Sequence, residues 1–176
     1  KNGAFNGQGI LREAWGDIYI GSFKNNKAQG YGKQDMFLNG QPNGTFGGEL
    51  KNDLLNGEGY WESDGCRSEG TFKDHYLEGK GKITCDYGYE AKGIFKNGNL
   101  NGQGSESWKD GSYQSGKYKE GVLDGEGSIN YTNGSKESGT FKDGKLHGYG
   151  ITIWNTGTKY EGDWVNGDGT GNATFT

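Results

Sequence analysis

The sequence predicts an all-β fold, in which stacked β-hairpins form an elongated, single-layer antiparallel sheet that curves and twists into a solenoid-like rod. Glycine supplies 37 of the 176 residues and proline only one, a composition that disfavours helices and is typical of a turn-rich β structure. Only 29% of the residues are hydrophobic, yet 14% are aromatic, which indicates an ordered chain with a thin core. The glycines and aromatic residues also recur at a regular interval, and this predicts a repeat architecture.

Each predicted repeat begins at a glycine, and these glycines recur every 22, 23 or 27 residues. They are Gly21, Gly48, Gly70, Gly93, Gly116, Gly139 and Gly162. A pair of glycines separated by one residue follows in nearly every repeat, as at Gly102 and Gly104, Gly125 and Gly127, and Gly148 and Gly150. A residue without a side chain leaves room for a neighbouring ring to lie across it. We therefore expect even alanine to clash at these structural glycines.

A large side chain stands two residues after each starting glycine, on the same face of its strand, because strand side chains alternate. The aromatic members of this row are Phe23, Phe72, Phe95, Tyr118, Phe141 and Trp164. A two-residue turn follows each member, as at Asn97-Gly98, and such pairs favour the type I′ hairpin, in which both central residues have positive φ. The second strand of each repeat leads to further large side chains, including Trp108, Tyr131 and Trp154, before a second turn closes the unit.

One repeat departs from this length. It spans 27 residues and holds Pro42 in an enlarged turn. An extra residue in one strand of a pair bends the strand and displaces the register. We therefore expect a kink or a bulge near residues 37–47.

Segments such as 160–167 (YEGDWVNG) and 139–150 (GTFKDGKLHGYG) resemble the MORN (membrane occupation and recognition nexus) repeat, which reads Tyr-x-Gly-x-aromatic-x-x-Gly followed by Gly-x-Gly. The resemblance divides residues 1–176 into about seven and a half units: a partial unit 1–18, units beginning near 19, 46, 68, 91, 114 and 137, and a partial unit 160–176. The first position departs from tyrosine at Ser68, Ala91, Gln114 and Glu137. The chain lacks an initial Met and begins within a repeat, so we expect it to be part of a longer polypeptide.

The resemblance implies a protein–protein interaction scaffold without enzymatic activity, of the kind found in cytoskeletal and ciliary assemblies such as axonemal radial spokes. It therefore implies a cytoplasmic, cytoskeletal or axonemal location. An open single-layer sheet cannot cover all of its own rings, so we expect a helical or extended segment of a partner protein to occupy an aromatic groove. The predicted groove residues are Phe23, Phe72, Phe95, Tyr118, Phe141, Trp164, Trp108, Tyr131 and Trp154.

A row of lysines follows the aromatic row, three residues after each starting glycine. This lysine ladder consists of Lys24, Lys51, Lys73, Lys96, Lys119 and Lys142. Strand alternation places it on the face opposite the aromatic row, where a solvated surface is the simplest interpretation. The alternative is a binding site for anionic lipid headgroups or an acidic partner. The net charge of −4 opposes that alternative and predicts no binding to nucleic acid.

Two cysteines, Cys66 and Cys85, are too few for a disulfide framework, and free thiols in a reducing cytosol are the expectation. No cluster of histidine, cysteine or carboxylate residues predicts a metal, a cofactor or a catalytic nucleophile. The sequence leaves three alternatives to the scaffold: a membrane-attachment module that binds phosphoinositides, the regulatory arm of a larger enzyme, and a carbohydrate-binding hairpin solenoid.

Overall fold

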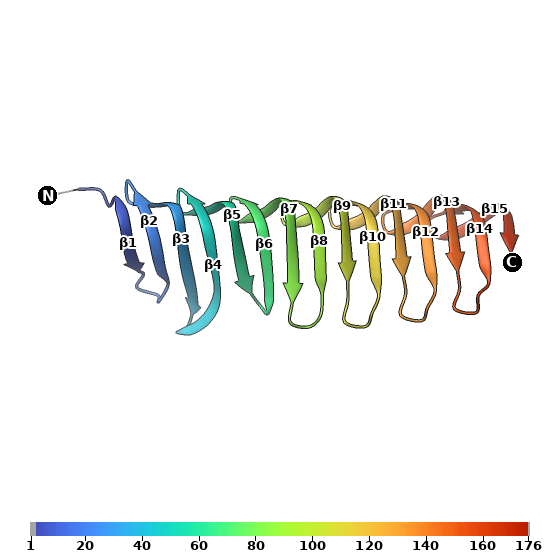
Figure 1. Cartoon of the computed structure of the whole chain (residues 1–176), viewed down its shortest axis with the longest axis horizontal. Helices are drawn as coiled ribbons and strands as arrows, with labels where there is room; N and C mark the ends of the chain where they lie inside the picture. The colour runs from blue at the N-terminus through green and yellow to red at the C-terminus, as the bar shows by residue number, and fades with distance from the viewer. Residues whose placement is uncertain (1–2, 176) are drawn as a thin grey trace. The chain divides into compact units, whose positions relative to one another are not determined.

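The computed structural model describes residues 3–175 and consists of two compact units, Lys1–Asp86 (unit 1) and Tyr87–Thr176 (unit 2). Both units are built from antiparallel hairpins of consecutive strands (Figure 1). Residues 3–175 contain no helix, and therefore no helix that could span a bilayer. The prediction of an all-β fold made of antiparallel hairpin repeats is confirmed.

Unit 1 contains seven strands, and each pairs with the next along the chain. Their bounds are β1 (Gly7–Arg12), β2 (Ile18–Lys24), β3 (Lys27–Leu38), β4 (Gln41–Lys51), β5 (Leu54–Ser63), β6 (Cys66–Lys73) and β7 (Tyr76–Cys85). Unit 2 contains eight strands in the same sequential arrangement. Their bounds are β8 (Glu90–Lys96), β9 (Asn99–Ser107), β10 (Tyr113–Lys119), β11 (Val122–Asn130), β12 (Lys136–Lys142), β13 (Lys145–Ile153), β14 (Lys159–Val165) and β15 (Asp168–Phe175).

The two-residue turns have the backbone conformation that the sequence predicts. Asn97 and Gly98 have φ angles of 49° and 80°, and Asp143 and Gly144 have 48° and 77°. Positive φ at both central residues defines the type I′ turn, whose twist matches that of the flanking strands. These turns also contact the preceding repeat, as where Gly121 N donates to Leu100 O at 2.8 Å.

The core of each unit forms beside these short turns, where the aromatic row meets a row of leucines. Phe95 pairs with Leu100, and Tyr118 pairs with Leu123, across their hairpins. The core side chains expose 7% of their surface or less; they include Phe46, Leu50, Leu55, Phe72 and Leu77 in unit 1, and Phe95, Leu100, Tyr118, Leu123, Phe141, Leu146 and Trp164 in unit 2. We call the face of the sheet that carries them the core face. The leucine row was not predicted from the sequence, although it follows each short turn.

The structural glycines allow a close approach of two backbones as well as ring packing. A Cβ atom at Gly116 would lie 2.5 Å from Gly127 Cα, and one at Gly104 would lie 2.8 Å from Leu100 Cδ2. The expectation that a ring covers each glycine holds at Gly150, where an added Cβ atom would lie 3.1 Å from Trp164 Cδ1. In the middle repeats it is wrong, because paired glycine backbone and leucine side chains fill that space.

The enlarged repeat has the predicted irregularity. Met36 pairs with Gly44, whereas the next residue, Phe37, pairs with Pro42, so the register shifts within the β3–β4 hairpin. Asn43 is the extra residue on β4. The expected bulge between residues 37 and 47 is thereby confirmed.

Candidate functional site

Three aromatic residues of unit 2 occupy the same position in three successive hairpin loops. Trp108, Tyr131 and Trp154 each begin a loop, and the N–H of each donates to the carbonyl four residues later at 2.9 to 3.1 Å. Each also accepts a hydrogen bond from the glycine three residues later, which has a φ between 85° and 88°. Identical loop geometry therefore holds the three side chains at equivalent positions. We call them the ring row.

The ring row is partly exposed, in contrast to the rings of the core. Trp108, Tyr131 and Trp154 expose 36%, 40% and 38% of their surface. Of the other predicted groove residues, Phe72, Phe95, Tyr118, Phe141 and Trp164 expose 7% or less, and Phe23 is half-buried. The buried rings pack against the leucine row and leave little surface for a partner. The ring row is thus the part of the predicted groove that a ligand could reach.

Two carboxylates accompany the ring row on the core face of unit 2. Glu137 lies four residues before Phe141 on β12, and strand alternation places these two side chains on one face. Tyr131 Oη donates to Glu137 Oε2 at 2.9 Å. Burial of Tyr131, and then this hydrogen bond, raise the pKa of the phenol, so it stays a neutral donor.

Glu106 has a similar environment one hairpin earlier. Its carboxylate accepts hydrogen bonds from Tyr89 Oη and Gln114 Nε2. The Tyr89 ring lies 5.8 Å from the Trp108 ring, centroid to centroid. Within the described part of unit 2, neither Glu106 nor Glu137 forms an ion pair. The core face beside the ring row therefore combines half-exposed rings with negative charge.

The lysine ladder lies at the short turns and is exposed to solvent. Lys24, Lys51 and Lys73 belong to unit 1, and Lys96, Lys119 and Lys142 belong to unit 2. None of the six forms an ion pair with the residues between 3 and 175. Lys51, Lys73 and Lys119 pair across their turns with the exposed apolar residues Leu54, Tyr76 and Val122. The other three lysines pair with Lys27, Asn99 and Lys145.

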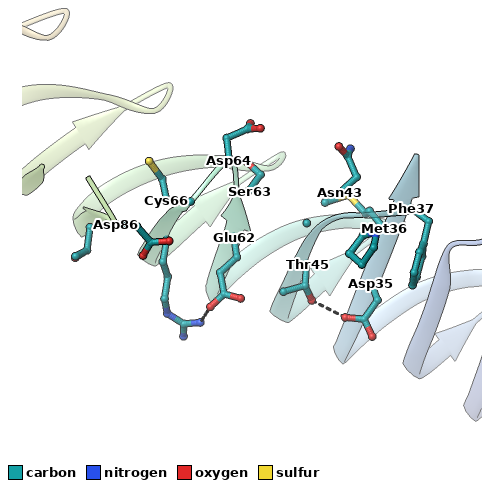
Figure 2. Close-up of a pocket in the computed structure, with 15 residues that line it drawn as sticks. Asp35, Met36, Phe37, Asn43, Thr45, Glu62, Ser63, Asp64, Cys66 and Asp86 are labelled. Atoms are coloured by element: carbon teal, nitrogen blue, oxygen red, sulfur yellow. Dashed lines mark hydrogen bonds and ion pairs between the residues drawn. The ribbon is translucent and has the colours of Figure 1, made fainter. Parts of the chain in front are cut away.

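Unit 1 has a cavity of about 900 Å³ beside the enlarged hairpin. Figure 2 shows its lining, with Met36 and Phe37 on one side and Glu62, Asp64 and Cys66 on the other. The lining of the cavity therefore combines apolar and acidic side chains.

Carboxylates dominate the charge of this cavity. Thr45 Oγ1 donates to Asp35 Oδ1 at 2.9 Å, and the Lys33 ammonium, which also bonds Asp35, lowers the pKa of that carboxyl. Among the described residues of the lining, Arg67 is the one cation, and it already pairs with Glu62 and Glu69. No group of three or more histidine, cysteine or carboxylate side chains in the part of the chain that the structure describes could hold a metal ion.

Comparison with known families fits the hairpin geometry. The MORN repeat model matches residues 19–35, 69–86, 92–113, 115–136, 138–159 and 160–176, which together exceed half of the chain. The chain belongs to the MORN repeat family. The unmatched residues 36–68 include the bulged hairpin, so the MORN pattern is interrupted where the register shifts.

One solved structure similar to this MORN chain is the SAS-4 (dCPAP) TCP domain in complex with a Proline Rich Motif of Ana2 (dSTIL) of Drosophila melanogaster. The two share 13% sequence identity at a TM-score of 0.46, over 96% of this chain and 88% of that chain. No curated protein matches the chain.

The cysteines of the MORN array are not free, contrary to expectation. Cys66 and Cys85 form a disulfide, and their Cα atoms lie 4.0 Å apart. The two residues are direct partners in the β6–β7 ladder. Their nearly equal distances from the Asp74-His75 turn were the sequence signal for this pairing. The expectation of a reducing compartment depended on free thiols, so the disulfide removes the argument for it.

Sequence reasoning also missed the acidic residues beside the ring row. Gln114 and Glu137 stand at the position where the MORN pattern has tyrosine, and from the sequence they were interpreted only as departures from it, whereas Glu106, two residues after Gly104, was not singled out. Cross-strand pairing places Glu106 opposite Gln114, and Ile129 opposite both Gln114 and Glu137, in one row across the core face. A signal was therefore present, because this row holds polar residues on β9, β10 and β12, with the apolar Ile129 on β11 between them.

Proposed function

We propose that this chain is a protein–protein interaction module without catalytic activity, and that a segment of a partner protein binds the core face of unit 2 across the ring row. The observation that carries the proposal is the equivalent, half-exposed placement of Trp108, Tyr131 and Trp154. The core of the unit is closed by other residues, so these rings are not needed to complete it. Exposed aromatic residues of this kind are enriched where proteins bind one another.

A peptide-display experiment tests this proposal. A random-peptide library is selected on the chain, and the affinity of enriched peptides is measured for three proteins. These are the wild type, a variant in which Trp108, Tyr131 and Trp154 are all alanine, and Tyr149→Ala as a matched control. Tyr149 is 58% exposed and lies next to Gly150, on the opposite face of β13.

The expected result is a loss of affinity of about tenfold or more in the triple variant, equal to about 1.4 kcal/mol, with no loss in Tyr149→Ala. Failure to enrich any peptide would contradict the proposal. So would equal binding by the triple variant, provided that circular dichroism shows all three proteins to be folded.

The lysine ladder supports a second candidate function, attachment to anionic lipid. Its six ammonium groups have no carboxylate partner among residues 3–175, and three of the lysines pair across their turns with exposed apolar residues. Each lysine close to an anionic surface contributes about 1 kcal/mol of attraction. The chain should then co-sediment with phosphatidylserine vesicles at low salt, and substitution of Lys73, Lys96 and Lys119 by glutamate should abolish this binding. No sedimentation at low salt would remove the candidate.

The cytoskeletal or ciliary setting suggested by the family resemblance remains a prediction. It is tested by the location of the tagged full-length protein in ciliated cells. A diffuse or extracellular distribution would contradict it.

A further inference from the structure

We propose that the ring row binds a polyproline II segment that carries basic residues. This inference deepens the proposed function and rests on it, since it specifies the chemistry and the conformation of the partner. Three properties of unit 2 support it: the spacing of the rings, the indole N–H groups of Trp108 and Trp154, and the charge beside the rings.

The spacing of the rings matches the repeat of a polyproline II helix. Successive members of the ring row are two strands apart, because each repeat contributes one hairpin, and two strands span about 9.6 Å. A polyproline II helix has three residues per turn and rises about 9.3 Å per turn. Every third residue of such a segment would meet a successive ring, with little accumulated mismatch over Trp108, Tyr131 and Trp154. The side chains on one face of a partner β-strand repeat every ~6.8 Å, so they would not coincide with successive rings.

The indole N–H groups favour polyproline II over an α-helix. Trp164 Nε1, in the core, donates to Gly150 O at 3.1 Å. In the described part of unit 2, Trp108 and Trp154 make no such bond, and both indoles are partly exposed. A polyproline II helix has no internal hydrogen bonds, so all its carbonyls are free to accept. An α-helix presents carbonyls that are already bonded.

The charge of the site determines which polyproline II segments would bind. The hydrogen-bond donors to Glu106 and Glu137 include Tyr89, Gln114 and Tyr131, which are neutral, and neither carboxylate forms an ion pair within the described part of unit 2. Both carboxylates therefore keep an uncompensated negative charge next to the rings. Arginine fits this environment best, because its guanidinium pairs with carboxylates and stacks on aromatic rings.

Calorimetric titration of the whole chain with defined peptides tests the inference. The probe is an acetylated peptide of about 12 residues built from Pro-Pro-Arg triplets, which is long enough to cross the three rings. The control peptide has the same length and charge but consists of Gly-Gly-Arg triplets, which form no stable polyproline II helix. A basic amphipathic peptide that forms an α-helix is the third ligand.

The expected result is that the Pro-Pro-Arg peptide binds about tenfold tighter than the two other peptides. Trp108→Ala, Tyr131→Ala and Trp154→Ala should each weaken that binding by about fivefold or more, whereas Tyr149→Ala should not. Trp154→Phe keeps a ring but removes the N–H donor, so its affinity should lie between those of the wild type and Trp154→Ala. Glu137→Gln should weaken binding and reduce its salt dependence.

Equal binding of the Pro-Pro-Arg and Gly-Gly-Arg peptides would overturn the inference, since charge alone would then explain the binding. Stronger binding of the helical peptide, or equal effects of Tyr149→Ala and Trp154→Ala, would overturn it too. These failures are distinguishable from failure of the proposed function. If peptides selected from the random library still depend on the ring row, the interaction site stands and only its polyproline II specificity is wrong.

Discussion

At the residue scale, His75 combines the roles of a turn residue and a core residue. It stands at the second position of a type I′ turn, with a φ of 71°. Its Nδ1 accepts a hydrogen bond from Leu55 N at 3.2 Å. The imidazole also contacts the stacked rings of Phe46 and Trp61 edge to face, at centroid distances of 5.2 and 5.3 Å. The hydrogen bond requires a neutral ring, because a protonated Nδ1 cannot accept.

This environment predicts a pH dependence of stability. Burial lowers the pKa of His75 below its ordinary value of 6.5, and the nearby Asp74 carboxylate offsets only part of this effect. The unfolded chain then binds more protons, so the free energy of unfolding should decrease as the pH falls below about 6.5. Urea unfolding between about pH 8 and about pH 5 measures this.

His75→Asn is the matched control for this measurement. Asparagine tolerates a positive φ and offers a side-chain oxygen, and Asp53 fills the equivalent role by accepting from Ala28 N at 2.7 Å. The variant should lose part of the pH dependence while remaining folded. An identical pH profile in both proteins would show that His75 does not contribute.

At the scale of the hairpin, the paired glycines determine how closely two strands approach. Gly116 pairs with Gly127, after which the register shifts so that Tyr118 pairs with Leu123. A Cβ at Gly127 would lie 2.9 Å from Ser115 O and 3.0 Å from Leu123 Cδ1. Gly127→Ala should therefore lower the free energy of unfolding by about 1 to 3 kcal/mol through crowding.

Gly111→Ala, in the loop between β9 and β10, provides the comparison. Gly111 has a φ of 87°, and a Cβ atom at this position would have no neighbouring atom within 4 Å. Its substitution therefore costs only the backbone strain of about 1 to 2 kcal/mol. The midpoint and enthalpy of thermal unfolding measure the loss of stability in each variant. Hydrogen exchange of the Leu123 amide then distinguishes crowding in Gly127→Ala from backbone strain in Gly111→Ala. Unchanged packing around Leu123 in Gly127→Ala would contradict the crowding argument.

The sequence could predict the strands and turns of these hairpins, because glycine pairs and Asn-Gly or Asp-Gly turns act locally. It could not predict which of the predicted groove rings remain exposed. Tyr118 and Tyr131 look alike in the repeat, but only Tyr118 meets a leucine across its hairpin. The Cys66–Cys85 disulfide was missed for a related reason. Cross-strand register decides such contacts, and the bulges that fix the register are not apparent from spacing alone.

At the scale of the whole molecule, the chain has two compact units, and each has a core of its own. In repeat proteins each repeat contacts mainly its neighbours, so stability is close to a sum of local contributions. A substitution that leaves a large cavity in the core of one unit should consequently destabilise the strands around it first. The 23-residue pattern predicted the repeats but gave no sign of two units, because the starting glycines Gly70, Gly93 and Gly116 keep the same interval on both sides of residue 86.

Phe95→Ala tests this local stability. Phe95 is 2% exposed and pairs with Leu100, so its loss should lower the free energy of unfolding of unit 2 by about 3 to 5 kcal/mol. Hydrogen exchange should show that amides of β8, β9 and β10 lose protection first, while those of β2 to β5 keep theirs. Phe23→Ala removes the same ring from a half-buried position of the row and should cost clearly less. Equal loss of protection in all strands after Phe95→Ala would mean that the array unfolds as one cooperative structure, contrary to the local argument.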